Sequence, residues 1–257
     1  MSDYEAVKKR KLRKRKIQKA ITSILLIIVF ILWGIYALLQ SDFFNLKDVV
    51  ILENNTLKQE DVFQISKLGM GRNILKYNLG EIKENVEAHP YIKEAYVERK
   101  LPGKITIKVK ERSEYAIMAY MGSYLYIDQE GVVLGVKDNG LTQQIPLITG
   151  AKFNTLKVGE KADLVNTEDV IKVLKLLEAA NLSEMMDTIS EINISESANF
   201  RLITFDGIEV QLGKAENPAY LMLALKEVLV NLYTINRRDV IIDMRYEGHI
   251  TVKDRNI

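Results

Sequence analysis

The sequence contains no cysteine, only four prolines and only two histidines, His89 and His249. Without cysteine, no disulfide can crosslink the chain and no thiolate can act as a nucleophile or metal ligand. The scarcity of proline, together with the lack of any glycine- and serine-rich stretch, argues against a long flexible linker. The two histidines lie far apart in the sequence, so ordinary surface roles are favoured over a shared metal site. We therefore expect stiff modules that follow one another closely, with no metal and no cofactor.

The motifs that carry common catalytic chemistry are also missing. There is no Gly-x-Ser-x-Gly elbow, and Gly69 and Gly71 lack the third glycine of a dinucleotide-binding loop. Acidic residues are plentiful, but they fall on the polar faces of expected helices and strands. A carboxylate pair for glycoside cleavage depends on spatial proximity, which the sequence does not reveal, so a cell-wall hydrolase stays an open alternative. The sequence predicts that the chain is not an enzyme and takes no small-molecule substrate.

One long apolar run, residues 20–40, reads AITSILLIIVFILWGIYALLQ and contains no charged side chain. A helix rises 1.5 Å per residue, so this run can cross a hydrocarbon core of about 30 Å. A buried core helix is normally shorter and carries a polar stripe. A cleavable signal peptide would have small residues before its cleavage site, which Ala37-Leu38-Leu39-Gln40 does not provide. We therefore predict an uncleaved transmembrane helix over residues 20–41.

Positive charge is concentrated before this run. Residues 1–19 hold nine Lys and Arg against two acidic residues, whereas the rest of the chain holds 27 against 32. A dense basic cluster beside a span remains cytoplasmic and is attracted to anionic lipids. Nucleic-acid binding is the alternative for a basic run, but it needs more assumptions here. We expect a cytoplasmic tail over residues 1–19 and a mildly acidic region, without affinity for nucleic acid, on the outer side.

Residues 43–112 predict a small module with the element order β-α-α-β-β. Thr56 and Gln59 have the spacing of a capping box at the start of the first helix. Gly103, in the turn Leu101-Pro102-Gly103-Lys104, is expected to supply a positive φ between the last two strands. The sheet must bury one face under the helices because its other face is rich in Lys and Glu. Strands are expected over residues 46–52, 93–99 and 104–110, with a second helix between Asn78 and Pro90.

Residues 113–257 predict a mixed, β-rich domain with two or three helices. Asn166 or Thr167 is expected to begin one helix, and Pro218 suits the first turn of another. Asp206-Gly207 predicts a type I′ turn between two strands. Strands are expected over residues 115–120, 123–128, 132–134, 200–205, 208–212, 239–245 and 249–253, with a short apolar segment at residues 145–150.

Several of these segments resemble one protein family. The Gly-x-Asn-Ile-Leu loop at residues 71–75 and the run HPYIKEAYVERKLP at residues 89–102 resemble a POTRA domain. The order of motifs along the chain is similar to that of the FtsQ/DivIB family of bacterial cell-division proteins. One departure is Ser113-Glu114, where that family often has proline. The later matching segments are YLYIDQEGVVLG (124–135), IPLITG (145–150), FDGIEVQLG (205–213) and IDMRYEGHITVK (242–253).

The resemblance implies an α+β fold with one N-terminal transmembrane helix, a POTRA domain at residues 43–112 and an FtsQ/DivIB-type domain at residues 113–257. It also implies a non-enzymatic protein of the bacterial cell membrane that acts at the division septum. Its implied partners are FtsB/DivIC-like and FtsL-like division proteins, each with a single span. POTRA domains also occur in envelope assembly, so an assembly adaptor is the alternative.

The last expected strand, residues 249–253, has no later strand to cover it. We expect a sheet edge whose free N–H and C=O groups can pair with a partner strand. Arg245 and Tyr246 come just before it and are residue types favoured as interface anchors. The alternative is that Arg245 makes a local ion pair while Tyr246 fills the core. In the resembled family this strand and the preceding turn bind the FtsB/DivIC partner, which implies these binding residues: Arg245, Tyr246, Gly248, His249, Ile250, Thr251 and Val252.

Overall fold

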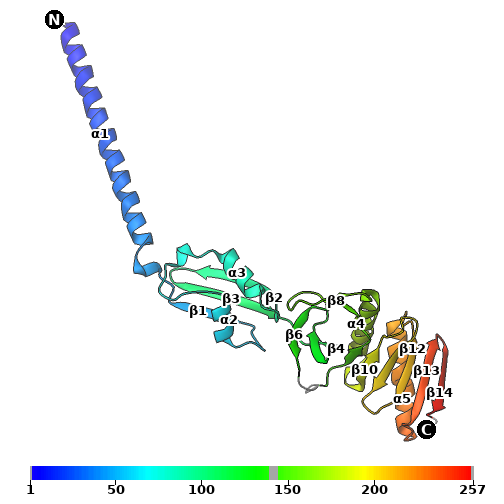
Figure 1. The fold of residues 1–257 in the computed structure, drawn as a ribbon. Helices are drawn as coiled ribbons and strands as arrows, with labels where there is room; N and C mark the ends of the chain where they lie inside the picture. The colour runs from blue at the N-terminus through cyan, green and yellow to red at the C-terminus, as the bar shows by residue number, and fades with distance from the viewer. Residues whose placement is uncertain (1, 139–143, 256–257) are drawn as a thin grey trace. The chain divides into compact units, whose positions relative to one another are not determined.

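The structure is a computed structural model that describes residues 2–138 and 144–255, with side chains from residue 16 onward (Figure 1). It contains two compact units. The first holds most of the chain up to residue 109, and the second holds residues 55–57, 86–94 and the chain from residue 110 onward. The basic side chains of the expected tail up to Arg15 lie outside the described part.

The first unit begins with the helix α1 (Ser2–Leu39). Within it, the 24 residues Lys16–Leu39 have a mean hydropathy of 2.6 in their most apolar window, and none of that window is buried. This stretch is long and apolar enough to cross a membrane, as the sequence predicts. Large side chains such as Phe30 and Trp33 are 72% and 65% exposed, which a hydrocarbon environment would accommodate.

The elements after α1 follow the predicted order β-α-α-β-β. The three strands form one sheet in the order β1-β3-β2, and β1 runs parallel to β3. The central strand β3 buries Ile105, Ile107 and Val109 completely, which is the alternation that the sequence shows. The elements are β1 (Asp48–Leu52), α2 (Gln59–Ile65), α3 (Leu79–Glu87), β2 (Ile92–Lys100) and β3 (Lys104–Glu111), with 3-10 turns at Asp42–Phe44 and Ile74–Lys76.

The predicted capping box at Thr56 is wrong. The helix α2 begins at Gln59, and its N-cap residue makes no side-chain cap. Instead, the carboxylate of Glu111 accepts hydrogen bonds from the backbone amides of Thr56 and Leu57 at 2.7 and 3.0 Å. Burial alone would raise the pKa of Glu111, but these amide donors outweigh it and lower the pKa. A charge-assisted acceptor from 54–55 residues away therefore fixes the turn before α2, while α2 itself has no side-chain N-cap.

The prediction of a positive φ at Gly103 is also wrong. The Leu101–Pro102 peptide bond is cis, and Gly103 is not among the residues with positive φ. Glycine is required there for a different reason. A Cβ atom on Gly103 would lie 2.5 Å from the carbonyl oxygen of Asn45, which no side chain allows.

The second unit is built on a nine-stranded sheet with the order β14-β13-β12-β11-β10-β7-β4-β5-β6. The helices α4 (Thr167–Leu182) and α5 (Pro218–Thr234) bury their apolar side chains in one core with the inner residues of these strands. The strands are β4 (Ala116–Tyr120), β5 (Ser123–Ile127), β6 (Val133–Lys137), β7 (Leu147–Thr149), β10 (Ile189–Asn193), β11 (Phe200–Thr204), β12 (Glu209–Gly213), β13 (Val240–Tyr246) and β14 (His249–Asp254); β8 (Phe153–Thr155) and β9 (Asp163–Leu164) form a separate pair, and Met186–Thr188 is a 3-10 turn.

Two details of this unit differ from the sequence prediction. The strands β8, β9 and β10 are not predicted, although β10 lies in the middle of the sheet between β7 and β11. The turn at Asp206-Gly207 is not type I′, because only Gly207 has a positive φ, of 83°. The amide of Thr204 donates to the carbonyl of Ile208, which leaves a three-residue loop between the strands.

The two edges of the sheet are β14 and β6. Figure 1 shows β14 as the outermost strand beyond β13. The prediction that the last strand is a sheet edge is therefore confirmed for the described residues. This edge and the turn before it are the candidate site.

Candidate functional site

The hairpin of β13 and β14 is irregular at one point. The two strands pair antiparallel, and their register shifts between Asp243 and Tyr246. Gly213, at the end of β12, lies against this irregularity with a φ of 63°. A Cβ atom on Gly213 would lie 3.3 Å from the Cα atom of Arg245. The bulge in β13 and the close approach of Gly213 together fix the direction in which the Arg245 side chain leaves the sheet.

Arg245 is held by a carboxylate of its own strand. Its Nε and Nη2 atoms donate to the two oxygens of Asp243 at 2.9 and 2.6 Å, and its backbone amide donates to Asp243 at 3.2 Å. The hydrogen bonds from Arg245 lower the pKa of Asp243. The side chain of Asp243 is 14% exposed, whereas that of Arg245 is 42% exposed. The local ion pair that the sequence left as the alternative therefore forms, and it orients the guanidinium while leaving part of it open to solvent.

Tyr246 does not fill the core. It is 70% exposed, so the alternative that placed it among buried side chains is wrong. A tyrosine combines a large apolar ring with a polar hydroxyl and loses little side-chain entropy when it is covered. Arg245 and Tyr246 thus present an oriented cation and an open aromatic ring at the end of β13.

The turn between β13 and β14 is fastened to the start of α5. The amide of Gly248 donates to the hydroxyl of Tyr220 at 2.9 Å. The side chain of Asn217 donates to the carboxylate of Glu247 at 3.0 Å, and its oxygen accepts from the amide of Tyr220 at 3.3 Å. Asn217 therefore caps α5, with Pro218 in the first turn as predicted, and ties the turn down at the same time.

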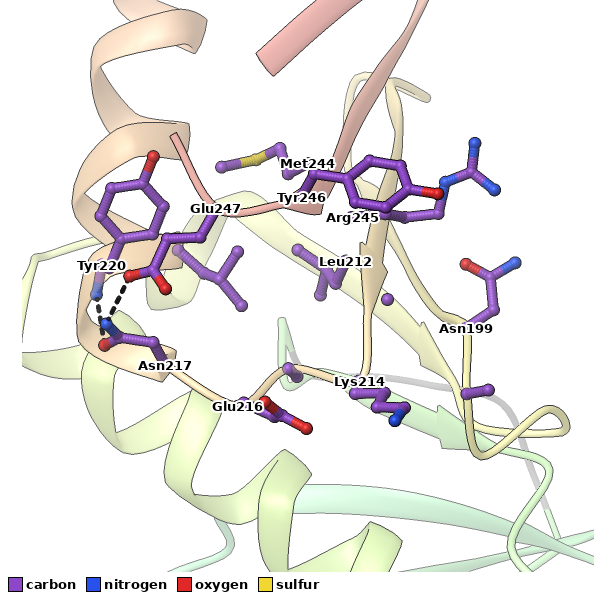
Figure 2. Close-up of a pocket in the computed structure, with 14 residues that line it drawn as sticks. Asn199, Leu212, Lys214, Glu216, Asn217, Tyr220, Met244, Arg245, Tyr246 and Glu247 are labelled. Atoms are coloured by element: carbon purple, nitrogen blue, oxygen red, sulfur yellow. Dashed lines mark hydrogen bonds between the residues drawn. The ribbon is translucent and has the colours of Figure 1, made fainter. Parts of the chain in front are cut away.

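A groove of about 510 Å³ opens beside this turn. In Figure 2, Arg245, Tyr246 and Asn199 lie on one side of the groove, and Asn217, Tyr220 and Glu247 lie on the other. Its lining mixes polar and apolar side chains, which suits a polypeptide better than a small apolar ligand. The remaining lining residues are Ala198, Leu212, Gly213, Lys214, Ala215, Glu216, Leu221 and Met244.

The edge strand β14 offers backbone groups to solvent. The amide of Arg255 donates to the carbonyl of Asp239, which fixes the hydrogen-bonding pairs of the β13–β14 ladder. Because such pairs alternate, the N–H groups of Ile250 and Val252 point away from β13. The side chains of Ile250 and Val252 are half-buried against the core, and Thr251 is exposed. The outer side of β14 is an unpaired ladder with an apolar and a polar face.

The seven residues singled out from the sequence therefore lie together in one continuous hairpin. Four residues that support them were not predicted from the sequence: Asp243, Tyr220, Asn217 and Gly213. The pairing of Asp243 with Arg245 could have been predicted, because residues two apart on a strand share a face. Tyr220 and Gly213 depend on contacts between distant segments. Among residues 16–138 and 144–255, no group of three or more His, Asp or Glu side chains has the arrangement of a metal site.

Comparisons with known proteins match two consecutive parts of the chain. The family described as "POTRA domain, FtsQ-type" matches residues 44–112, and "Cell division protein FtsQ/DivIB, C-terminal" matches residues 117–245, half of the chain. The cell division protein DivIB of Clostridium tetani is 36% identical over 118 residues, 46% of this chain and 44% of that protein. DivIB of Clostridium acetobutylicum is 32% identical over 121 residues, 47% of this chain and 49% of that protein.

The chain thus spans about half the length of the curated relatives that it matches. A solved structure, the major extracytoplasmic domain of DivIB from Geobacillus stearothermophilus, has 12% sequence identity and a TM-score of 0.30 over 49% of this chain and 96% of that chain. The matches to both family domains, in order along the sequence, identify the family. The chain belongs to the FtsQ/DivIB family of cell division proteins.

Proposed function

We propose that this chain is a non-enzymatic scaffold of bacterial cell division that binds a partner by β-strand addition at β14. The observation that carries this proposal is the exposed edge strand with the Arg245–Gly248 turn beside it. A partner strand on β14 satisfies the outward backbone groups of Ile250 and Val252. The FtsB/DivIC-like and FtsL-like division proteins are the proposed partners, since the family resemblance implies them.

The turn gives this edge its specificity. A ladder of backbone hydrogen bonds is similar for any partner strand, so discrimination must come from side chains. Arg245 offers a partly open guanidinium to an acidic group, and Tyr246 offers ring surface for an apolar contact. Both are oriented before binding, by Asp243 and by the fastened turn, which lowers the entropy lost on association. His249 and Thr251 extend the polar side of the same surface.

The proposed topology is a single span with the N-terminus in the cytoplasm. The basic cluster at residues 1–19 supports this orientation because Lys and Arg beside a span remain on the cytoplasmic side. A POTRA domain at residues 43–112 and an FtsQ/DivIB-type domain at residues 113–257 then lie outside the membrane. We place the protein at the division septum.

Co-purification of the full-length tagged chain from membranes of its host tests the site. The variants Arg245→Glu and Tyr246→Ala should each reduce recovery of the DivIC-like partner by about tenfold or more, the effect of losing one anchor. Lys157→Gln, a change at a 73% exposed lysine outside β13 and β14, is the control and should retain the partner. Full recovery with both anchor variants would refute the site assignment.

Two further measurements separate this function from its alternatives. A fluorescent fusion of the full-length chain should form a ring at midcell, whereas uniform membrane label would favour an envelope-assembly adaptor. The purified chain incubated with peptidoglycan should release no soluble fragments. Release of fragments would establish a cell-wall hydrolase and overturn the proposal.

A further inference from the structure

A short segment ahead of the second family match, Val86–Glu94, belongs to the second unit. It covers the end of α3 and the start of β2. We propose that this segment is a strap, a conformational device in which two polar clusters hold Tyr91 and Lys93 against the chain that follows β3, so that the β5–β6 turn of the second unit needs the strap for its rigidity. The strap is distinct from the β14 site and does not depend on the proposed function.

The first polar cluster is a chain of ion pairs. Lys93 Nζ lies 2.7 Å from Glu130 Oε1, and Arg112 Nη1 lies 2.9 Å from Glu130 Oε2. The same guanidinium nitrogen also donates to Asp128. The side chains of Arg112 and Asp128 are only 16% and 7% exposed. Such buried charges depend on one another, because removing one partner leaves the other desolvated and unpaired.

Asp128 connects this cluster to the backbone of the β5–β6 turn. Its Oδ1 atom accepts from the amides of Glu130 and Val132 at 2.9 and 2.8 Å. The turn is therefore shaped around a carboxylate that Arg112 neutralises. The amide of Arg112 donates to the carbonyl of Tyr91 at 2.8 Å, so the backbone of the strap is bound at the same place.

The second polar cluster lies around Glu114. Ser113-Glu114 is the position at which the resembled family often has proline. The hydroxyl of Tyr91 donates to Glu114 at 2.5 Å, and Lys137 donates to the same oxygen at 3.0 Å. The Lys137 ammonium also lies 3.7 Å from the ring centre of Tyr126, which is fully buried. Burial and the hydrogen bond to Glu114 both raise the pKa of Tyr91. The strap thus supplies a hydroxyl to a carboxylate that is 12% exposed.

The arrangement makes a specific prediction about coupling. Lys93 and Tyr91 lie two residues apart in the strap, yet each is bound to a different partner cluster in the later chain. If the strap is required, loosening it must also loosen the β5–β6 turn, because Glu130 loses Lys93 and because Arg112, the partner of Asp128, loses the Tyr91 carbonyl that holds its backbone. If the strap were independent of the β5–β6 turn, only the strap itself would become more mobile.

Hydrogen exchange of the full-length chain in detergent micelles, read by mass spectrometry, tests this coupling. In the double variant Tyr91→Phe, Lys93→Met, we expect exchange at residues 88–94 and at residues 128–132 to accelerate together by about tenfold, as for one cooperative opening. Peptides of β13 and β14 should be unchanged. Lys157→Met is the matched control, since Lys157 pairs with Glu160 and the two side chains are 73% and 60% exposed.

Faster exchange at residues 88–94 without any change at residues 128–132 would overturn the proposal, and so would no change in either segment. Should the double variant fail to fold, the single variants Tyr91→Phe and Lys93→Met provide the same test. Each must accelerate exchange in both segments, by less than the double variant. A single variant that affects only its own segment would likewise refute the strap.

Discussion

The hydroxyl of Tyr220, in the first turn of α5, accepts a hydrogen bond from the backbone amide of Gly248 at 2.9 Å. This bond joins a helix start to a hairpin turn 28 residues later in the chain. It places the turn beside the groove of Figure 2 and holds the Arg245–Gly248 segment in one conformation. The proposed recognition of a partner depends on that fixed geometry.

Removal of this hydroxyl should loosen the turn without unfolding the domain. For Tyr220→Phe we expect a loss of about 0.5–1.5 kcal/mol in local stability, the net value of one hydrogen bond. The exchange rate of the Gly248 amide, measured by NMR on the full-length chain in micelles, should rise by about threefold to tenfold. An unchanged rate would mean that the hydrogen bond does not hold the turn.

The direction of the N–H groups on β14 predicts different effects for proline substitutions at two neighbouring positions. Val252→Pro removes an outward N–H, so it should weaken partner binding by about threefold to tenfold while the chain stays folded. Thr251→Pro removes an inward N–H that pairs with β13 and should lower the thermal midpoint. Titration with the partner measures the affinity of each full-length variant, and thermal unfolding measures its midpoint. Equal partner affinity for Val252→Pro and the unaltered chain would contradict strand addition at this edge.

Gly213 should be intolerant of any side chain because it has a positive φ and lies against Arg245. In Gly213→Ala the new Cβ atom would come within 3.3 Å of the Arg245 Cα atom. We expect a destabilisation of about 1–2 kcal/mol and weaker partner binding, since the bulge that orients Arg245 must shift. Gly122→Ala is a control with a similar φ of 87° and no atom near the new methyl group. Comparable loss of partner binding in both variants would show that backbone strain alone is responsible.

Glu130 predicts a defined response to acid. Its hydrogen bonds with Lys93 and Arg112 lower its pKa from 4.5 to about 2. A carboxyl whose pKa is lower in the folded state stabilises the fold fully above its unfolded pKa and loses that effect as pH falls through the folded value. The difference in thermal midpoint between the unaltered chain and Glu130→Gln should therefore be constant above about pH 5.5 and should shrink between pH 4.5 and 2. A difference that does not change between neutral pH and pH 2 would contradict this assignment.

Local patterns in the sequence predict most of the strands and both long helices of the second unit. Alternation identifies β3 in the first unit, the turn at Met121-Gly122 separates β4 from β5, and the apolar spacing with Pro218 identifies α5. The strand β10 is the instructive failure. Its apolar residues Ile189 and Ile192 are three positions apart, so the alternation that marks a strand is broken. The ladder accommodates this spacing by a register shift between Ile189 and Glu191. It forms because neighbours on both sides supply hydrogen bonds.

The same distinction holds for the site. Arg245, Tyr246 and the edge strand were accessible because they are contiguous in sequence and resemble a family motif. Three contacts could not be predicted: the hydrogen bonds of Glu111 to the Thr56 and Leu57 amides, the close approach at Gly103 and the fastening of Gly248 by Tyr220. Each depends on two segments that only the folded chain brings together, and no local propensity encodes such a contact.

Site-specific photocrosslinking in living cells tests the central claim most directly. A photoreactive amino acid at Thr251 on β14 should crosslink the full-length chain to a single-span division protein. The same residue placed at Val136, on the opposite edge strand β6 and 44% exposed, should not. Crosslinking to that partner from Val136 but not from Thr251, or from neither position, would contradict the account.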